Sequence, residues 1–266
     1  MQDASTTTTG PDLTGHPLQD TIRYFAAGMG DVTGFLTSGA AAAILTVLEV
    51  QARDGIAGPM AEIGTFHGKT LIGLGLALRE QEAILGVDLF VHNGMDFEAT
   101  LRANCARYGI REERLRLHRG PSTGLGQRQW RELLGAPARF VHVDGEHTRA
   151  AARNDLALAA GFLAPSGAIL VDDVLHPWFP DVTLGVADFL NGHPELRAVA
   201  LFDRQGPMRN GGPKLLVTAV EDEDRYKQAT AAAMRENLVR ETEFCTSRPL
   251  VFCFDNGARK RLLALG

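Results

Sequence analysis

Two apolar segments of this 266-residue chain, 139–143 and 168–171, are each followed directly by carboxylate side chains. Asp144 follows the first segment, and Asp172 and Asp173 follow the second. Apolar runs of this length are typical of buried strands, and an open α/β sheet binds its ligands at the carboxyl ends of its strands. Carboxylate oxygens are the ligands that Mg²⁺ prefers in proteins. The pattern therefore predicts a divalent-cation site at Asp144, Asp172 and Asp173 or, without a metal, loops that these aspartates order.

Three side chains close to these carboxylates in the sequence could accept a proton during catalysis. Glu146 and His147 follow Asp144 by two and three residues, and His176 follows Asp173 by three. An imidazole titrates near neutral pH without special tuning, so we expect His147 to act as the base, with Glu146 next and His176 as a further candidate. Each histidine could instead be a hydrogen-bonding turn residue, and Glu146 could instead favour the start of the following helix.

A glycine-containing turn upstream indicates a second ligand at the same edge of the sheet. Gly64 and Gly68 lie between a predicted strand and a predicted helix, where the missing Cβ lets the backbone approach a ligand. Their spacing is neither GxGxxG nor that of a P-loop, which argues against a nicotinamide dehydrogenase. Asp88 ends the next predicted strand 20 residues after Gly68, where a carboxylate can bind ribose hydroxyls. Ser122 follows the third strand, where an adenine ring would lie, so the sequence predicts a nucleoside site.

These residues must be positioned by short strands that alternate with helices. The strands that we predict are 60–63, 83–88, 114–118, 139–144, 168–172, 197–203 and 214–220. The helices that we predict between them are 69–79, 96–108, 127–134, 148–163 and 182–191. Short connections between alternating elements favour right-handed βαβ units, and the last two strands are too close for a crossover helix. We therefore expect an α/β fold, with a mostly parallel seven-stranded sheet, an antiparallel last hairpin and helices on both faces.

The segments that flank these strands are expected to belong to one structural domain with them. Ser38 is a candidate N-cap for a helix near the N-terminus, and the C-terminal part should hold a helix at about 222–239 and a strand at 249–254. The regions that we predict are a disordered arm (1–17), a helical lid (18–58), the ligand-binding core (59–220) and a C-terminal extension (221–266).

Composition and charge limit the classes of function. Hydrophobic residues make up 45% of the chain and charged residues 22%, as in ordinary globular proteins. A net charge of −5 gives no electrostatic reason to expect nucleic-acid binding, and no apolar run approaches the roughly 20 residues of a membrane span. Three cysteines without CxxC spacing argue against a disulfide framework or a thiolate zinc site. We therefore expect a cytoplasmic protein that binds neither nucleic acid nor a membrane.

Four segments of the sequence together resemble the class I S-adenosylmethionine-dependent methyltransferases, over about residues 35–220. They are Glu62-Ile63-Gly64-Thr65-Phe66-His67-Gly68, Asp88, Gly120-Pro121-Ser122 and Asp144-Gly145-Glu146-His147. The resemblance implies a Rossmann-like fold, a glycine turn against the methionine part of S-adenosylmethionine, and a ribose-binding acid at the end of the second strand. The cofactor-binding residues that it implies are Glu62, Gly64, Thr65, Phe66, His67, Gly68, Asp88, Ser122 and Asp144.

Within this family, the sequence is most similar to metal-dependent O-methyltransferases of the catechol type and of the macrocin and aminocoumarin tailoring type. In these enzymes, an Asp after strand four and an Asp-Asp or Asp-Asn pair after strand five hold Mg²⁺, and these positions match Asp144, Asp172 and Asp173. His147 stands where the catechol-type enzymes have a catalytic lysine. Glu146 matches an acid that is the proposed base in the aminocoumarin type.

The resemblance therefore implies Mg²⁺-dependent O-methylation of a hydroxyl on a small specialised metabolite or sugar, with S-adenosylmethionine as the methyl donor. A metal-independent N- or C-methyltransferase of the same fold is one alternative, in which the three aspartates only shape the pocket. A non-catalytic protein that binds the cofactor or assists assembly is another. The C-terminal extension could mediate a homo-oligomer.

Overall fold

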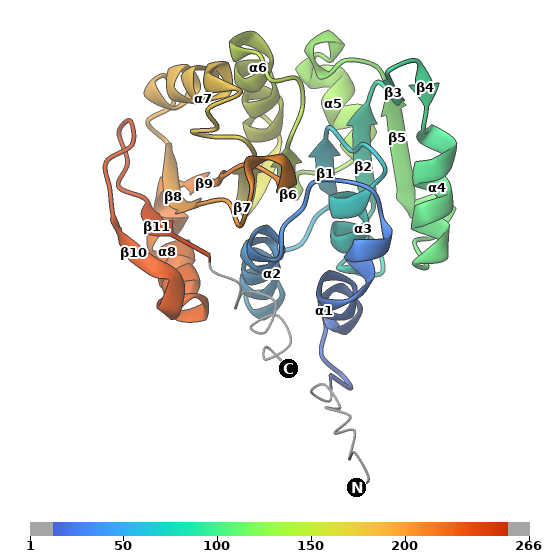
Figure 1. The fold of residues 1–266 in the computed structure, drawn as a ribbon, viewed down its shortest axis with the longest axis horizontal. Coiled ribbons are helices and arrows are strands. Elements are labelled where there is room, and N and C mark those ends of the chain that lie inside the picture. Colours follow the sequence, from blue (N-terminus) through green and yellow to red (C-terminus); the bar gives the residue numbers. More distant parts are fainter. Residues whose placement is uncertain (1–12, 255–266) are drawn as a thin grey trace, which may run out of the picture.

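A nine-stranded β-sheet forms the centre of the molecule, with helices packed on both of its faces (Figure 1). The computed structural model describes residues 13–254; residues 1–12 of the predicted arm and 255–266 of the predicted C-terminal extension lie outside the described residues. The strands of this sheet are β1 (Met60–Ile63), β2 (Ile84–Asp88), β5 (Leu115–Arg119), β6 (Ala138–Val143), β7 (Leu163–Val171), β8 (Leu196–Phe202), β9 (Lys214–Ala219), β10 (Leu238–Glu241) and β11 (Leu250–Phe252). Their order across the sheet is β10-β11-β8-β9-β7-β6-β1-β2-β5.

The α-helices of the described residues form two layers. They are α1 (Gln19–Ala26), α2 (Ser38–Arg53), α3 (Lys69–Leu76), α4 (Glu98–Arg107), α5 (Gln127–Leu134), α6 (Arg149–Ala160), α7 (Pro180–Asn191) and α8 (Glu223–Ala233). Helices α1 to α4 and α8 share one hydrophobic core with one face of the sheet, and α5, α6 and α7 share a second core with the other face. Successive side chains of the central strands point to opposite cores, as the alternation of a β-strand requires.

All seven predicted strands are present, and β8 and β9 form the predicted antiparallel hairpin. The sheet nevertheless has nine strands and not the seven that we expected. Strand β11, predicted at 249–254, pairs parallel to β8, and β10 pairs antiparallel to β11 at the edge of the sheet. β10 starts inside the segment that we expected to be helical. Asn237 explains the change, because its side chain donates to the Cys253 carbonyl at 2.8 Å and its own carbonyl accepts the Cys253 N–H at 2.9 Å.

A second, two-stranded sheet was not predicted. Strands β3 (Val91–His92) and β4 (Met95–Asp96) pair antiparallel after β2. Asn93 and Gly94 form the turn between them, with φ angles of 50° and 77°. A two-residue Asn-Gly turn with both φ angles positive is the type that matches the twist of a hairpin.

Helix α2 is Ala-rich and buried along most of its length, in the same core as α8. The predicted N-cap at Ser38 is wrong by one residue. Thr37 caps the helix, and its Oγ1 accepts the Ala40 N–H at 3.2 Å. The N-cap position requires an extended backbone, which Thr37 has, whereas Ser38 is already helical.

A buried ion pair lies at the amino ends of the central strands. Arg139 Nε and Nη2 donate to the two carboxylate oxygens of Glu82, each at 3.0 Å. The remaining donors of Arg139 reach Gln51 Oε1 at 2.8 Å and the Ala77 carbonyl at 2.9 Å. Two backbone N–H groups complete the hydrogen bonds of the Glu82 carboxylate. We call this group of side chains the amino-edge pair.

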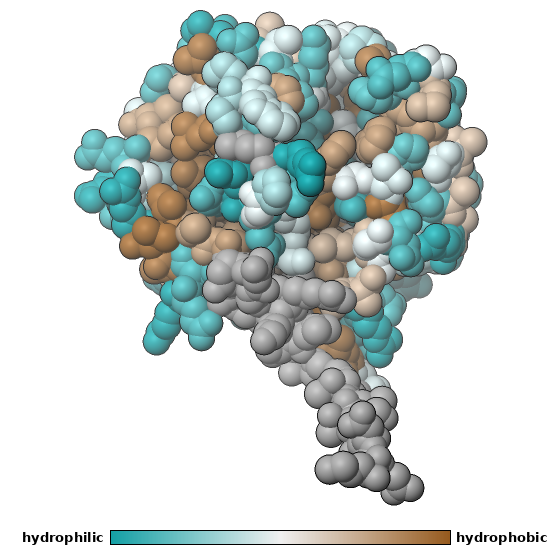
Figure 2. All heavy atoms as spheres, viewed as in Figure 1, coloured by the Kyte–Doolittle hydropathy of each residue, from teal (hydrophilic) through white to brown (hydrophobic). Residues whose placement is uncertain are grey.

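The carboxyl ends of β1, β2, β5, β6 and β7 meet at the opposite edge, because these neighbouring strands are parallel. The loops that follow them carry the residues singled out in the sequence. Figure 2 shows polar and apolar side chains interspersed over the face of the molecule seen in Figure 1. Among the described helices, none combines the length and the apolar character needed to cross a lipid bilayer.

Candidate active site

A cavity of about 430 Å³ opens at the carboxyl ends of the strands, a volume typical of small-molecule sites. Its walls combine aromatic and aliphatic side chains with carboxylates. The predicted cofactor residues that line it are Gly64, Phe66, Asp88, Ser122 and Asp144, together with the two predicted bases Glu146 and His147. Glu62, Thr65, His67 and Gly68 are not among its lining residues.

Asp88 holds the glycine turn in place. Its Oδ2 accepts the backbone N–H groups of Thr65 at 2.8 Å and Phe66 at 2.9 Å, and its Oδ1 accepts the Phe90 N–H at 2.8 Å. The Thr65 hydroxyl also donates to Asp88 Oδ2, at 3.3 Å. A carboxylate offers about four acceptor sites, so a ligand hydroxyl on the cavity side would replace this long hydrogen bond. Asp88 therefore builds the turn in addition to facing the cavity.

Both glycines of the turn occupy positions that other residues would strain. Gly64 has a φ of 85° and Gly68 a φ of 88°, in the left-handed region. A Cβ on Gly64 would overlap the carbonyl oxygen of Asp144, so the turn after β1 lies directly against the loop after β6. Gly68 is the N-cap residue of α3. The predicted close approach at Gly64 is therefore an approach to the protein's own backbone.

Glu62 lies buried with His142, and their side chains form a pair with unsatisfied polar atoms. Glu62 Oε1 lies 2.9 Å from His142 Nδ1. Glu62 Oε2 and His142 Nε2 have no hydrogen-bond partner among the described residues. Burial, and then the charge of Asp144, hold the pKa of Glu62 well above its ordinary value, while burial holds the pKa of His142 well below. Burial therefore opposes the charged form of both groups.

Ser122 is held at the cavity by helix α6. Asn154 Nδ2 donates to the Ser122 carbonyl at 3.1 Å and to Asp155 Oδ1 at 3.2 Å. Asp155 is buried, and its Oδ2 has no hydrogen-bond partner in the described part of the chain. Burial raises the pKa of Asp155 to about 6, although hydrogen bonding to Ser122 and Asn154 lowers it in part.

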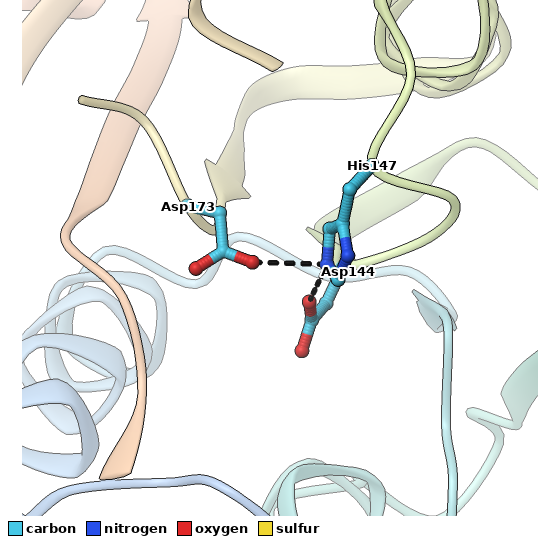
Figure 3. A group of neighbouring side chains, drawn as sticks. All are labelled: Asp144, His147 and Asp173. Carbon is cyan, nitrogen blue, oxygen red and sulfur yellow. Dashed lines mark ion pairs between the residues drawn. The ribbon is translucent and has the colours of Figure 1, made fainter. Parts of the chain in front are cut away.

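Asp144, His147 and Asp173 converge on one point beside the cavity, from the loops after β6 and β7 (Figure 3). His147 Nε2 lies 2.9 Å from Asp173 Oδ2 and 3.7 Å from Asp144 Oδ1. One ligand atom from each residue lies within 4.8 Å of the other two. Hydrogen bonding to Asp144 and Asp173 raises the pKa of His147 to about 10. His147 is therefore protonated near neutral pH when no metal is bound.

The backbone conformation at Asp173 sets the direction of its carboxylate. Asp173 has a φ of 60°, in the left-handed region that a non-glycine residue adopts only when its surroundings hold it there. Its N–H donates to Asp172 Oδ1 at 2.8 Å. Gly212, in the loop between β8 and β9, leaves the room that Asp173 Oδ1 occupies, because a Cβ there would overlap this oxygen.

Asp172 does not join this cluster, contrary to the prediction of three aspartate ligands. Its Oδ2 forms a buried ion pair with Lys214 Nζ; the Lys214 side chain is 2% exposed and that of Asp172 6%. The pairing of β7 with β9 places Val171 opposite Leu215, which brings the two charged residues side by side. Burial opposes the charge on Lys214, but Asp172 and Asp144 outweigh it and hold the pKa of Lys214 above its ordinary value. Lys214 is therefore a buried cation.

His176 lies buried apart from the cavity. Its Nδ1 accepts the Trp178 N–H at 3.1 Å, and its ring stacks on Phe179 with 4.9 Å between centroids. Phe179 also stacks on His147 at 3.9 Å. His176 does not line the cavity, so the structure brings Glu146 and His147 to the site and leaves His176 behind the aromatic ring of Phe179.

The predicted lid contributes a wall that lies over the glycine turn. Phe35 lines the cavity with 66% of its surface exposed, and its ring stacks on Phe66 at a centroid distance of 6.2 Å. Lys69 Nζ donates to the Gly34 carbonyl at 2.9 Å and so ties this segment to α3.

Sequence reasoning missed a second wall. Leu89, Val91 and His92, at and before the β3–β4 hairpin, also line the cavity. The Asn93-Gly94 pair between short apolar segments was the signal that could have revealed this hairpin. The ion pair of Lys214 could not have been found in this way, because a single charged residue at the start of an apolar strand does not indicate its partner.

Comparisons with known proteins agree with this architecture. Residues 61–174 match the family model of a methyltransferase domain. No curated protein matches the sequence. Similar solved structures include an O-methyltransferase from Bacillus cereus in complex with SAH (18% identity, TM-score 0.53, covering 76% of this chain and 90% of that chain). The O-methyltransferase TomG from Streptomyces achromogenes, involved in tomaymycin synthesis and in complex with SAM, is similar too (21% identity, TM-score 0.55, 77% and 89% covered).

A third similar structure is CalS11, a TDP-rhamnose 3′-O-methyltransferase of calicheamicin biosynthesis (15% identity, TM-score 0.51, covering 80% of this chain and 98% of that chain). These likenesses concern the fold. The domain match itself includes the glycine turn, Asp88 and both acidic strand ends. Residues 61–174 therefore match a methyltransferase domain, in agreement with the resemblance in the sequence.

Proposed function

We propose that this protein transfers a methyl group from S-adenosylmethionine to a hydroxyl of a small specialised metabolite or sugar, with the help of a divalent cation. The observation that carries the proposal is the convergence of Asp144, His147 and Asp173 beside the cavity that holds the glycine turn. The similar structures named above are O-methyltransferases, one of them acting on a sugar nucleotide, which supports the choice of a hydroxyl acceptor.

The cavity offers distinct contacts for the parts of the cofactor. We assign the ribose to Asp88, the adenine to Ser122 and the methionine part to the backbone at Gly64. The lining carboxylates Asp88, Asp144 and Glu146 make the cavity electronegative, which suits a sulfonium cation. When bound, S-adenosylmethionine supplies the methyl group as an electrophile.

The donor set beside the cavity fits a divalent cation. Two carboxylates and an imidazole, from Asp144, Asp173 and His147, present ligand atoms within 4.8 Å of one another. A cation held there would stabilise negative charge on the acceptor oxygen and so lower the pKa of the hydroxyl. We therefore assign the metal-binding carboxylates to Asp144 and Asp173.

Glu146 is the base that the geometry favours. It lines the cavity two residues after Asp144, whereas the Nε2 of His147 lies between Asp144 and Asp173, where it would bind the cation and could not also accept a proton. We propose that Glu146 takes the proton of the acceptor hydroxyl. The oxygen is then free to attack the methyl group in line with the leaving sulfur.

Calorimetry on the full chain tests the first part of the proposal. S-adenosylmethionine should bind with one site per chain, and a flat titration would refute the function. Transfer of a labelled methyl group to a panel of small-molecule hydroxyls then tests the reaction, with and without EDTA. Activity that persists both in EDTA and in Asp173→Asn would select a metal-independent N- or C-methyltransferase instead.

Two further parts of the proposal concern the setting of the enzyme. We propose a cytoplasmic location, with which the free thiols of Cys105, Cys245 and Cys253 agree. We also propose a homo-oligomer formed through the C-terminal extension, where β10 is an exposed edge strand. Sedimentation of the full chain tests the second point, since a monomer at micromolar concentration would contradict it.

A further inference from the structure

Lys214 gives the acidic site an unusual balance of charge. Three carboxylates, those of Asp144, Asp172 and Asp173, raise the pKa of the Lys214 ammonium, which lies buried beside Asp172. The single Lys214 ammonium pairs with Asp172 and leaves Asp144 and Asp173 to other partners. A divalent cation at this site would offset the negative charge of these two carboxylates.

Asp172 is not available as a metal ligand, because both of its carboxylate oxygens already have hydrogen-bond partners. Its Oδ2 pairs with Lys214 Nζ, and its Oδ1 accepts the Asp173 N–H at 2.8 Å. A metal ion could take Oδ2 only by displacing a buried ammonium, and an unpaired buried charge is strongly unfavourable. Lys214 therefore occupies, on Asp172, the position that a metal would need.

His147 takes the place that Asp172 leaves open. Its Nε2 lies between Asp144 Oδ1 and Asp173 Oδ2 (Figure 3). The ring is held flat against Phe179, with 3.9 Å between centroids and 21° between the planes. The donor set that faces the cavity side is thus two oxygens and one nitrogen. Mg²⁺ prefers oxygen ligands throughout, whereas imidazole suits first-row transition-metal ions.

We propose that Lys214 replaces the metal at Asp172, and that Asp144, His147 and Asp173 bind a divalent transition-metal ion, such as Co²⁺ or Mn²⁺, in preference to Mg²⁺. The inference rests on the proposed function, since a cation at this site is part of it. It differs from the expectation that three aspartates hold Mg²⁺, because the buried Lys214 pairs with Asp172 and leaves only two of them to bind a metal.

Calorimetric titration of the full chain with Co²⁺ and with Mg²⁺ tests the inference. The quantity to compare is the ratio of the Mg²⁺ to the Co²⁺ dissociation constant. We expect this ratio to fall at least tenfold in His147→Gln, because glutamine offers an amide oxygen where the imidazole nitrogen was. His193→Gln is the matched control, since His193 also pairs with a carboxylate, of Glu195 at 2.7 Å, and stacks on a phenylalanine, but lies outside the site.

A spectroscopic measurement supplies a readout that is independent of affinity. In the Co²⁺-loaded protein, an imidazole ligand gives a strongly shifted N–H proton signal that exchanges with water. This signal should be present in the wild type and in His193→Gln, and absent in His147→Gln. A Co²⁺-loaded wild type without it would overturn the role of His147 as a ligand.

Lys214→Met tests the other half of the inference. The substitution frees Asp172 for the metal, and the Mg²⁺ dissociation constant should fall about tenfold. Lys227→Met is the control, because it removes a lysine paired with Glu223 and Glu241 at the far end of the chain. An unchanged Mg²⁺ affinity in folded Lys214→Met would overturn the inference. If this variant does not fold, the His147→Gln comparison decides alone.

The outcomes separate the inference from the proposed function. A Mg²⁺ to Co²⁺ ratio that is the same in wild type and His147→Gln would overturn the inference and leave a cation-dependent methyltransferase. If neither ion binds while S-adenosylmethionine does, both the inference and the role of a cation are refuted, but the methyltransferase activity stands.

Discussion

Ionised side chains are buried at both ends of the central strands. Their charges and hydrogen bonds are matched by partners at one end and not at the other. In the amino-edge pair, each side-chain nitrogen of Arg139 donates a hydrogen bond, and Glu82 receives backbone hydrogen bonds as well. Although burial alone would raise it, the Arg139 guanidinium holds the pKa of Glu82 below its ordinary value. Charge and hydrogen bonds are balanced within this group.

At the carboxyl edge the balance is missing. Glu62, His142 and Asp155 each bury a polar atom without a partner among the described residues, and three aspartates face one lysine. Unsatisfied buried groups and unmatched charges cost stability. The comparison teaches that buried charge alone does not distinguish the two ends: the amino-edge pair is matched by its own side chains, and the carboxylates of the candidate site are not.

The largest effect should come from breaking the amino-edge pair. Glu82→Leu leaves Arg139 buried without a counter-charge and should lower the free energy of unfolding by roughly 3–5 kcal/mol. Urea denaturation measures this, with the exposed Glu80→Leu as the matched control. A loss below about 1 kcal/mol would mean that the pair is not what stabilises this edge.

The same kind of change at the carboxyl edge should affect activity and leave stability intact. Asp173→Asn relieves repulsion between neighbouring carboxylates but also weakens the pairing with His147, so the free energy of unfolding without metal should change by less than about 1 kcal/mol. Methyl transfer and metal affinity should both fall by at least roughly 100-fold. Asp181→Asn, on the exposed start of α7, is the control that should match the wild type.

Asp155 offers a test through pH. Its pKa is about 6 in the folded protein and near 3.9 when unfolded, so the folded state binds the proton more tightly. The stability that this proton provides is present below pH 4 and is lost as the pH rises through 6, by on the order of 2 kcal/mol. Asp155→Asn should be more stable than the wild type at pH 7, and equally stable at pH 4. An equal difference at both pH values would contradict this.

The smallest effect concerns His147 without metal. Its pKa of about 10 exceeds the unfolded value near 6.5, so its pairing with Asp144 and Asp173 stabilises the protein below pH 6.5 and ceases to do so as the pH rises through 10. The side chain is 37% exposed, and solvent screening should keep the effect below about 1 kcal/mol. Unfolding of wild type and His147→Gln, compared at pH 6 and pH 10 in EDTA, measures it.

Local patterns in the sequence were enough to predict the sheet and the edge at which the site lies. Short apolar runs that end in Asp88, Asp144 and Asp172 are visible without any knowledge of tertiary contacts, and each proved to be a strand of the expected kind. The cavity residues Gly64 and Ser122 followed from the same reading, because parallel strands bring their carboxyl ends together.

What escaped prediction depends on contacts between distant segments. Lys214 meets Asp172 through the register of β7 against β9, and register is set by packing and turns rather than by either strand alone. Residues 238–241 continue a helical pattern, yet Asn237 and Cys253 draw them into the sheet. Tertiary hydrogen bonds there override local propensity, which is a weak influence by comparison.

Gly64 has one more consequence. Its α-carbon rests against the carbonyl of Asp144, so the loop that would hold the methyl donor and the loop that would activate the acceptor touch through main-chain atoms. Their spacing is therefore a property of the backbone and does not depend on the side chains that line the cavity. Substitution of those side chains can therefore change the acceptor that is bound without changing the distance between the two loops. The same backbone could serve acceptors with different hydroxyl groups.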